Sequence, residues 1–133
     1  MGKGFSLIEL VVVIAIMGVL TFIALPNYTA IKKKSKLAAL AASGQTIQTA
    51  IESYAITTGS YPTGTGIDSG VLLSKLIESG DLRTIPKNPY TGKAFSSSDS
   101  AGKILYTYDS TAQVYQINLY GDDVTTAAIT LTN

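Results

Sequence analysis

The chain has 133 residues and a formal charge of +1, a length that suits one domain with an appendage. Because it contains no cysteine and no histidine, disulfides, thiolate nucleophiles, zinc-finger sites and imidazole general bases are excluded. The small net charge gives no global attraction toward nucleic acid, and no phosphate loop, dinucleotide fingerprint or HExxH motif occurs. We therefore expect neither an enzyme nor a bound cofactor.

An apolar run opens the chain from Phe5 to Leu25, and Glu9 is its only ionisable member. As a helix it would measure about 31 Å, close to the thickness of the hydrocarbon core of a bilayer. Three interpretations compete: a secretory signal peptide, a plain membrane anchor, and an anchor with a second purpose. The length of the run, the glutamate inside it and the missing A-x-A cleavage site argue against the signal peptide.

Lysines flank this run unequally, because Lys3 precedes it and a cluster follows it, made up of Lys32, Lys33, Lys34 and Lys36. By the positive-inside rule the cluster would place the body of the protein in the cytoplasm. Anionic lipid headgroups or the acids of neighbouring subunits are its candidate partners. Nucleic acid is not expected as a partner, because the lysines are few and no aromatic residues alternate with them.

The helix is expected to weaken at Gly18 and Pro26 and to become amphipathic beyond them. Pro26 cannot donate a hydrogen bond to the carbonyl of Phe22, which predicts a kink. Steps of three and four residues then place one stripe of side chains on a single face: Leu37, Leu40, Gly44, Ile47, Ile51 and Tyr54. We interpret this stripe as core against a sheet. A helix from Phe5 to Ala55 would span about 75 Å, so part of it must protrude from so small a domain.

Loops and one short helix follow. Residues 57–70 and 85–95 are predicted as loops, and residues 96–102 as a turn. Between them a helix is predicted that Asp68 or Ser69 caps and Gly80 stops, with an apolar face made of Val71, Leu72, Leu73, Leu76 and Ile77.

Three alternating segments end the sequence and predict strands, with turns at residues 110–113 and 121–123. Their apolar positions are Ile104, Tyr106 and Tyr108, then Tyr115, Ile117 and Leu119, then Ala127, Ile129 and Leu131. The fold class is therefore α+β: a long amino-terminal helix, membrane-spanning in its first half and amphipathic in its second, on an antiparallel sheet of three to four strands. Asp109, Asp122 and Asp123 at the strand ends are candidate calcium ligands, although we interpret them as solvated turn acids.

The amino-terminal segment Gly4-Phe5-Ser6-Leu7-Ile8-Glu9-Leu10 resembles that of the type IV pilin superfamily, which includes pilins and pseudopilins. Its features are a short basic leader ending in glycine, a phenylalanine, and a glutamate four residues on that opens an apolar helix. The resemblance extends to about residue 55 and implies a pilin-like fold. It implies three parts: a leader at 1–4 removed by prepilin peptidase, a transmembrane and assembly helix at 5–29, and a globular domain at 30–133.

The resemblance also implies roles for single residues. The peptidase would cut between Gly4 and Phe5, the new Phe5 amine would be methylated, and Glu9 would pair with the Phe5 amine of a neighbouring subunit. An acid reaching toward the headgroups is the alternative for Glu9. Gly18 and Pro26 stand where the family places helix-loosening residues.

The implied function is that of a structural filament subunit, held by a single pass in the cytoplasmic membrane and polymerised outward by membrane machinery into a surface filament. Its partners would be copies of itself, the peptidase, the assembly machinery and, before assembly, the membrane. Two alternatives stay open. The chain could be the major pseudopilin of a type II secretion system, or an anchored binding domain that never polymerises. The segment NPYTGKAF at 88–95 resembles one common in pseudopilins and simple pilins and keeps the first alternative open.

Overall fold

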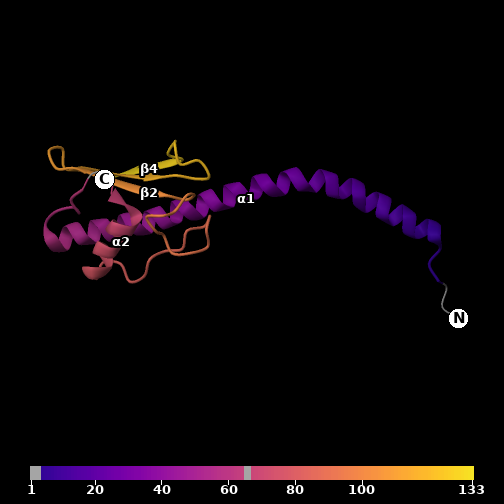
Figure 1. The fold of residues 1–133 in the computed structure, drawn as a ribbon, viewed down its shortest axis with the longest axis horizontal. Coiled ribbons are helices and arrows are strands. Elements are labelled where there is room, and N and C mark those ends of the chain that lie inside the picture. The colour runs from indigo at the N-terminus through magenta and orange to yellow at the C-terminus, as the bar shows by residue number, and fades with distance from the viewer. Residues whose placement is uncertain (1–3, 65–66) are drawn as a thin grey trace. The chain divides into compact units, whose positions relative to one another are not determined.

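The computed structural model describes residues 4–64 and 67–133, and the side chains of residues 24–26 lie outside this description. The chain forms two compact units, Met1–Ser35 and Lys36–Asn133. Helix α1 (Leu7–Thr58) runs through both of them, and the second unit holds all the other elements (Figure 1).

Helix α1 continues through Gly18 and Pro26 without a break in its assigned helical structure. The side chain of Pro26 is outside the described part, so the attribution to Pro26 of the bend described below stays a prediction. Within the described residues no single helix has the length and hydropathy of a membrane crossing. Two successive stretches of α1, Leu7–Ile23 and Asn27–Thr58, are bent where they meet. Taken together, they have the length and hydropathy of a membrane crossing.

The carboxyl end of α1 lies beyond the expected position. Thr57 and Thr58 were predicted to open a loop, but both are helical, and their hydroxyls donate to the carbonyls of Ser53 and Tyr54. Gly59 follows with φ +80°, and its N–H donates to the Ala55 carbonyl over 2.9 Å. A glycine in this left-handed conformation is the usual end of a helix, because other residues adopt it at a cost.

The second unit confirms the α+β fold class. Its sheet contains β1 (Ile67–Asp68), β2 (Ile104–Asp109), β3 (Val114–Leu119) and β4 (Ile129–Thr132), antiparallel throughout and in chain order. The turn at 110–113 joins β2 to β3, as predicted.

Two boundaries in the sheet differ from the predictions. Strand β1 lies inside the segment predicted as a loop. Its two residues are too few to show the alternation of apolar and polar side chains that is typical of a strand. They form a strand because they pair with β2. Strand β4 begins at Ile129 and excludes Ala127. Before it, the Asp123 carboxylate accepts hydrogen bonds from both the backbone N–H and the hydroxyl of Thr125, and this holds a turn.

The structure shows which of the two candidate residues caps helix α2 (Ser69–Glu78). The Asp68 carboxylate accepts hydrogen bonds from Gly70 N and Val71 N, so Asp68 is the cap, while the Ser69 hydroxyl donates to the Ser96 carbonyl. Gly80, with φ +83°, ends the helix as predicted. Val71 was expected on the apolar face but is 62% exposed, and Ile77 is 38% exposed. The buried face is narrower and consists of Leu72, Leu73 and Leu76.

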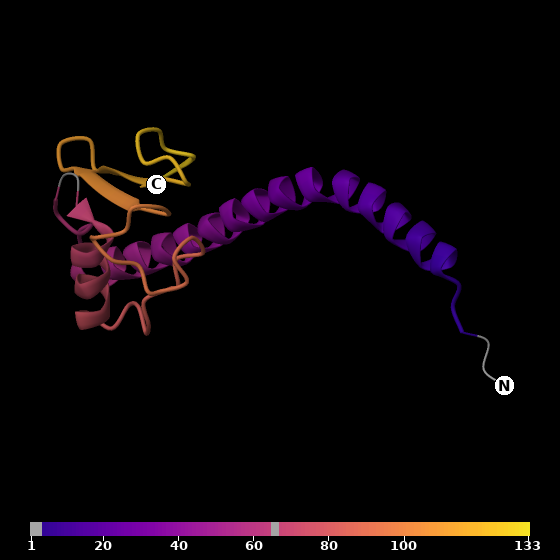
Figure 2. The same ribbon diagram turned by 45° about the vertical axis from the view of Figure 1, so that its right-hand side comes forward.

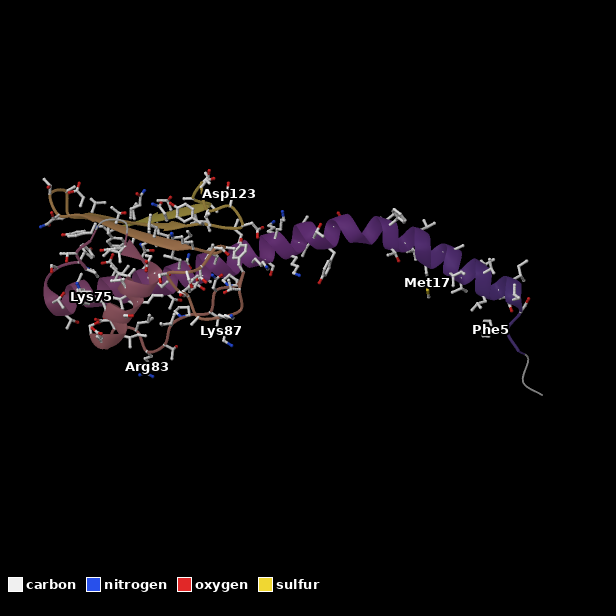
Figure 3. The ribbon with its side chains drawn as sticks, viewed as in Figure 1. Phe5, Met17, Lys75, Arg83, Lys87 and Asp123 are labelled. Atoms are coloured by element: carbon white, nitrogen blue, oxygen red, sulfur yellow. The ribbon has the colours of Figure 1, made fainter. Side chains whose placement is uncertain are left out.

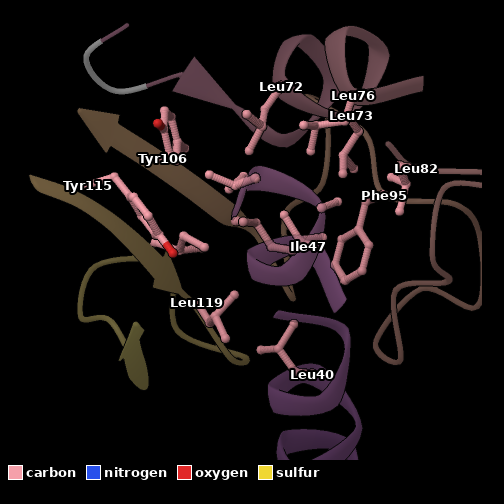
Figure 4. Packing of buried hydrophobic residues seen from close by; sticks show 14 residues of the cluster. Leu40, Ile47, Leu72, Leu73, Leu76, Leu82, Phe95, Tyr106, Tyr115 and Leu119 are labelled. Carbon is pink, nitrogen blue, oxygen red and sulfur yellow. The ribbon is translucent and has the colours of Figure 1, made fainter. Parts of the chain in front are cut away.

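The predicted stripe on α1 is core. Leu40, Ile47 and Ile51 are fully buried, and Leu37 and Tyr54 pack against them half-buried. The second half of α1 has the sheet on one side and α2 on another (Figures 1 and 2). Figure 4 shows Ile47 of α1 between the α2 leucines and the tyrosines of β2 and β3. The amphipathic half of α1 is therefore the centre of the second unit.

The segment 85–102 is a loop, as predicted, apart from one isolated bridge between Lys87 and Ala94. Asn88 organises it from a fully buried position: its amide donates to the Ala101 carbonyl over 2.8 Å and accepts from Tyr90 N over 2.9 Å. Gly102 lies so close that a Cβ there would clash with the Asn88 amide, so this loop is ordered by side-chain contacts.

Candidate functional site

The amino terminus of α1 carries a local arrangement that the sequence analysis did not name. The Ser6 carbonyl accepts from Leu10 N, the first hydrogen bond of the helix, and the Ser6 N–H donates to Oε2 of Glu9 over 2.8 Å. This is the glutamate half of a capping box, in which the third helical residue satisfies an otherwise unpaired N–H. The pattern S-x-x-E was present in the sequence and could have predicted it.

Capping fixes where the charge of Glu9 lies. The carboxylate sits over the first turn of α1, where the positive end of the helix dipole favours an anion. Ser6, which donates to this carboxylate, is next in the chain to Phe5, the residue whose amine the resemblance implicates. Within the described residues the second carboxylate oxygen, Oε1, has no hydrogen bond, so Glu9 can accept another donor while it caps the helix.

The surface around Glu9 is apolar and uncovered. Phe5 is 86% exposed and Leu7 81% exposed, and Phe5 and Met17 project from the ribbon in Figure 3. The side chains of Phe5, Ile8, Glu9, Val12 and Val13 surround one shallow hollow. Large contiguous exposed apolar surfaces mark sites that a partner or a membrane covers. The structure thus brings Phe5 and Glu9 together within such a surface.

Other predicted site residues do not line this hollow. A Cβ at Gly4 or at Gly18 would meet nothing within 4 Å, so neither glycine is required by packing within the described chain. Lys32, Lys33 and Lys34 are exposed. Lys36 differs from them: its Nζ lies 5.1 Å from the centroid of the Tyr90 ring, a cation–π contact.

The candidate calcium acids are not brought together. Asp109 accepts hydrogen bonds from Thr111 N and Ala112 N, which lower the pKa of its carboxyl, and bonds from Thr125 lower the pKa of Asp123. Among the described residues no three acids form a group that could hold a metal ion. The two carboxylates serve their own turns.

A second polar group is centred on Glu52. No pattern in the neighbouring sequence predicts it, so sequence reasoning missed it. The Glu52 carboxylate accepts hydrogen bonds from the hydroxyls of Tyr61 and Tyr115, of which Tyr115 is 63 residues away. Burial raises the pKa of both phenols, and the bond to Glu52 raises it further. Tyr106 lies beside Tyr115, and burial raises its pKa also.

Comparisons with known proteins bear on the amino-terminal segment and on most of the chain. Residues 2–25 match the family described as "Prokaryotic N-terminal methylation motif". A fimbrial protein of Neisseria meningitidis serogroup B is 37% identical over 106 residues, which cover 77% of this chain and 60% of that protein. The chain thus spans about three fifths of the length of this relative. No solved structure gives a significant match.

Proposed function

Because this chain is a type IV pilin-like protein, we propose that it is the structural subunit of a type IV pilus or a related surface filament. The observation that carries the proposal is the uncovered apolar face of α1 with Glu9 inside it. Packing many such helices side by side would replace lipid or water around them with protein. The subunit has a structural role and catalyses no reaction.

Processing is the first step of the proposed function. Prepilin peptidase cuts between Gly4 and Phe5, the leader 1–4 is lost, and the new Phe5 amine is methylated. The exposure of Phe5 and the open space around Gly4 support access by an enzyme. Until assembly, residues 5–29 hold the subunit in the membrane and residues 30–133 form its outward-facing body.

Assembly then uses the charge that cleavage creates. A Phe5 ammonium buried among apolar helices needs a partner, and the free Oε1 of a neighbour's Glu9 supplies one while Oε2 keeps its bond to Ser6 N. Gly18 and Pro26 mark the part of α1 that loosens on assembly, because Gly and Pro disfavour helix by about 1 and 3 kcal/mol relative to Ala. A filament reconstruction with unbroken helix from Gly18 through Pro26 would contradict this loosening.

A secretion pseudopilin is the second candidate. The segment 88–95 keeps it open, because such a segment resembles one common in pseudopilins as well as in simple pilins. A subunit of that kind also polymerises, so the same Glu9 chemistry applies. An anchored binding domain would instead stay monomeric in detergent.

The test separates processing from assembly in cells that produce the filament. We expect Glu9→Ala to be inserted and cut normally, since neither step uses the carboxylate, but to give at least about tenfold less sheared filament, because each incoming subunit buries an unpaired amine. Glu9→Gln should behave like Glu9→Ala, whereas Glu9→Asp keeps a charge and should retain part of the yield.

Gly4→Leu is the matched control for processing and should leave an uncut precursor and no filament. Mass spectrometry gives the mature terminus and electron microscopy counts filaments. A normal filament yield from Glu9→Ala would remove the pairing mechanism, and a chain beginning at Phe5 in Gly4→Leu would remove the processing step.

A further inference from the structure

The second unit contains a half-buried carboxylate with no counter-ion in the described chain. Oε1 of Glu52 accepts from the Tyr115 hydroxyl over 2.5 Å, and Oε2 accepts from the Tyr61 hydroxyl over 3.1 Å. No lysine or arginine of the described residues forms an ion pair with it. A partly buried charge is costly unless a cation or hydrogen bonds compensate it, and here two neutral phenols are its only partners in that part of the chain.

Glu52 also lines an open pocket of about 270 Å³ at the carboxyl end of α1. Tyr61 and Tyr108 form two of its walls, with ring centroids 5.7 Å apart and ring planes inclined at 59°. Ile56, which is 85% exposed, adds an apolar surface. Pockets for drug-sized molecules measure about 300 to 1,000 Å³, so this one suits a single side chain or a small amine.

The chemistry of these walls favours a cation. The face of an aromatic ring is electronegative and attracts an ammonium group, most strongly where water is excluded. The chain already uses this attraction twice, since Lys36 lies over Tyr90 and Lys75 lies over Tyr54. Glu52 adds a full negative charge beside Tyr61 and Tyr108.

A strained residue stands at the edge of the same pocket. Gln113 has φ +55°, a conformation that glycine adopts more readily than a residue with a Cβ. A residue with a side chain occupies this position all the same, and Gln113 lines the pocket. Strain of this kind is concentrated at functional sites, and an amide there adds a hydrogen-bond acceptor for a ligand N–H.

We propose that this pocket binds a primary alkylammonium group, with its charge against Glu52 and its stem against Tyr61, Tyr108 and Ile56. Two sources share this chemistry: a lysine side chain of another polypeptide, and a free alkylamine. The site contains no residue of the amino-terminal segment, so the proposal stands or falls independently of filament assembly.

The test uses the full chain, labelled with nitrogen-15, in a nonionic polyoxyethylene detergent that brings no cation of its own. The probes are n-butylammonium and N-acetyl-lysine methylamide, and neutral n-butanol is the control. We expect both ammonium probes to shift the amide resonances of Gly59, Ser60 and Gln113 saturably, with dissociation constants on the order of millimolar for such small ligands. Tighter binding of the lysine derivative by fivefold or more identifies a polypeptide source, and equal binding identifies the amine alone.

Two variants separate the contribution of the Glu52 charge from that of the Tyr108 ring. Glu52→Gln keeps one oxygen that accepts from one phenol, and its NH2 can donate to the hydroxyl oxygen of the other. This variant should weaken butylammonium binding at least tenfold, while Glu78→Gln, an exposed acid on α2, should not change it. Tyr108→Leu keeps an apolar wall and should weaken butylammonium but not butanol, which keeps the test valid if Glu52→Gln does not fold. Equal shifts by butanol and butylammonium, or full affinity in Glu52→Gln, would overturn the proposal.

Discussion

At the scale of single residues, Asp81 shows how one carboxylate joins two elements. Its Oδ1 accepts from the Ser53 hydroxyl of α1 over 2.7 Å, and its Oδ2 accepts from the Ser79 hydroxyl after α2 over 2.6 Å. These hydrogen bonds favour the ionised form and hold the pKa of Asp81 below its ordinary value. The ionised carboxylate therefore fastens the end of α2 to α1.

This bond predicts a dependence of stability on pH. The folded pKa lies below the ordinary value of 3.8, so the contribution of Asp81 is complete above that pH. As the pH falls below it the unfolded chain binds the proton first, and the contribution is lost as the pH passes through the folded pKa. We expect Asp81→Asn to unfold more readily at pH 6 and to lose less of its stability between pH 6 and pH 2.5.

The measurement is urea unfolding at several pH values, followed by the near-ultraviolet circular dichroism of the tyrosines. There are eight of them and no tryptophan to obscure their signal. Asp122→Asn, at an exposed acid, is the control and should follow the parent protein. An acid slope in Asp81→Asn equal to that of the parent would show that this carboxylate contributes nothing.

At the scale of elements, α1 packs tightly against the sheet at Gly44. A Cβ at this position would lie 2.6 Å from Cδ1 of Leu119 in β3 and 3.2 Å from Cδ1 of Leu131 in β4. Leu119 is fully buried and has little room to move. A glycine inside a helix costs about 1 kcal/mol relative to alanine, and here it allows the helix to lie against the strands.

We expect Gly44→Leu to lower the free energy of unfolding by about 1 to 3 kcal/mol, because the added atoms overpack a full core. Ala42→Leu adds similar bulk to an exposed position of the same helix and should change stability by less than about 0.5 kcal/mol. Urea midpoints of the two variants make the comparison. Equal midpoints would show that the sheet yields to the larger side chain.

At the scale of the whole molecule, the buried core belongs to one unit only. Its members run from Leu40 to Leu119, all within Lys36–Asn133, and the apolar side chains that the structure describes in the first unit are exposed. The hydrophobic effect therefore stabilises the second unit by itself, whereas the apolar surface of the first is available to a membrane or to other copies.

This difference predicts that residues 30–133 alone are a soluble, folded α+β domain. We expect helical far-ultraviolet circular dichroism, a tyrosine near-ultraviolet signal and one cooperative urea transition. The full chain without detergent is the comparison and should aggregate through its first unit. A fragment that lacks tertiary signal would refute the assignment of the α1 stripe as core.

The sequence by itself determined what local patterns control. The stripe of α1, the second helix and the β2–β3 hairpin each follow from periods of 3.6 or 2 residues, which reflect how neighbouring side chains share a face. The amino-terminal pattern from Gly4 to Glu9 is likewise local, and so is the cap that Glu9 forms on Ser6. That cap was open to prediction from S-x-x-E.

Only the tertiary structure decided the features that depend on distant partners. Strand β1 exists because β2 is beside it, Asn88 is buried because Ala101 and Gly102 close over it, and Val71 is exposed because its neighbours Leu72 and Leu73 face the core. The meeting of Glu52 with Tyr115 belongs to the same class. A hydrogen bond or a burial between residues far apart in the chain leaves no period in the sequence, since its two halves become neighbours only when the chain folds.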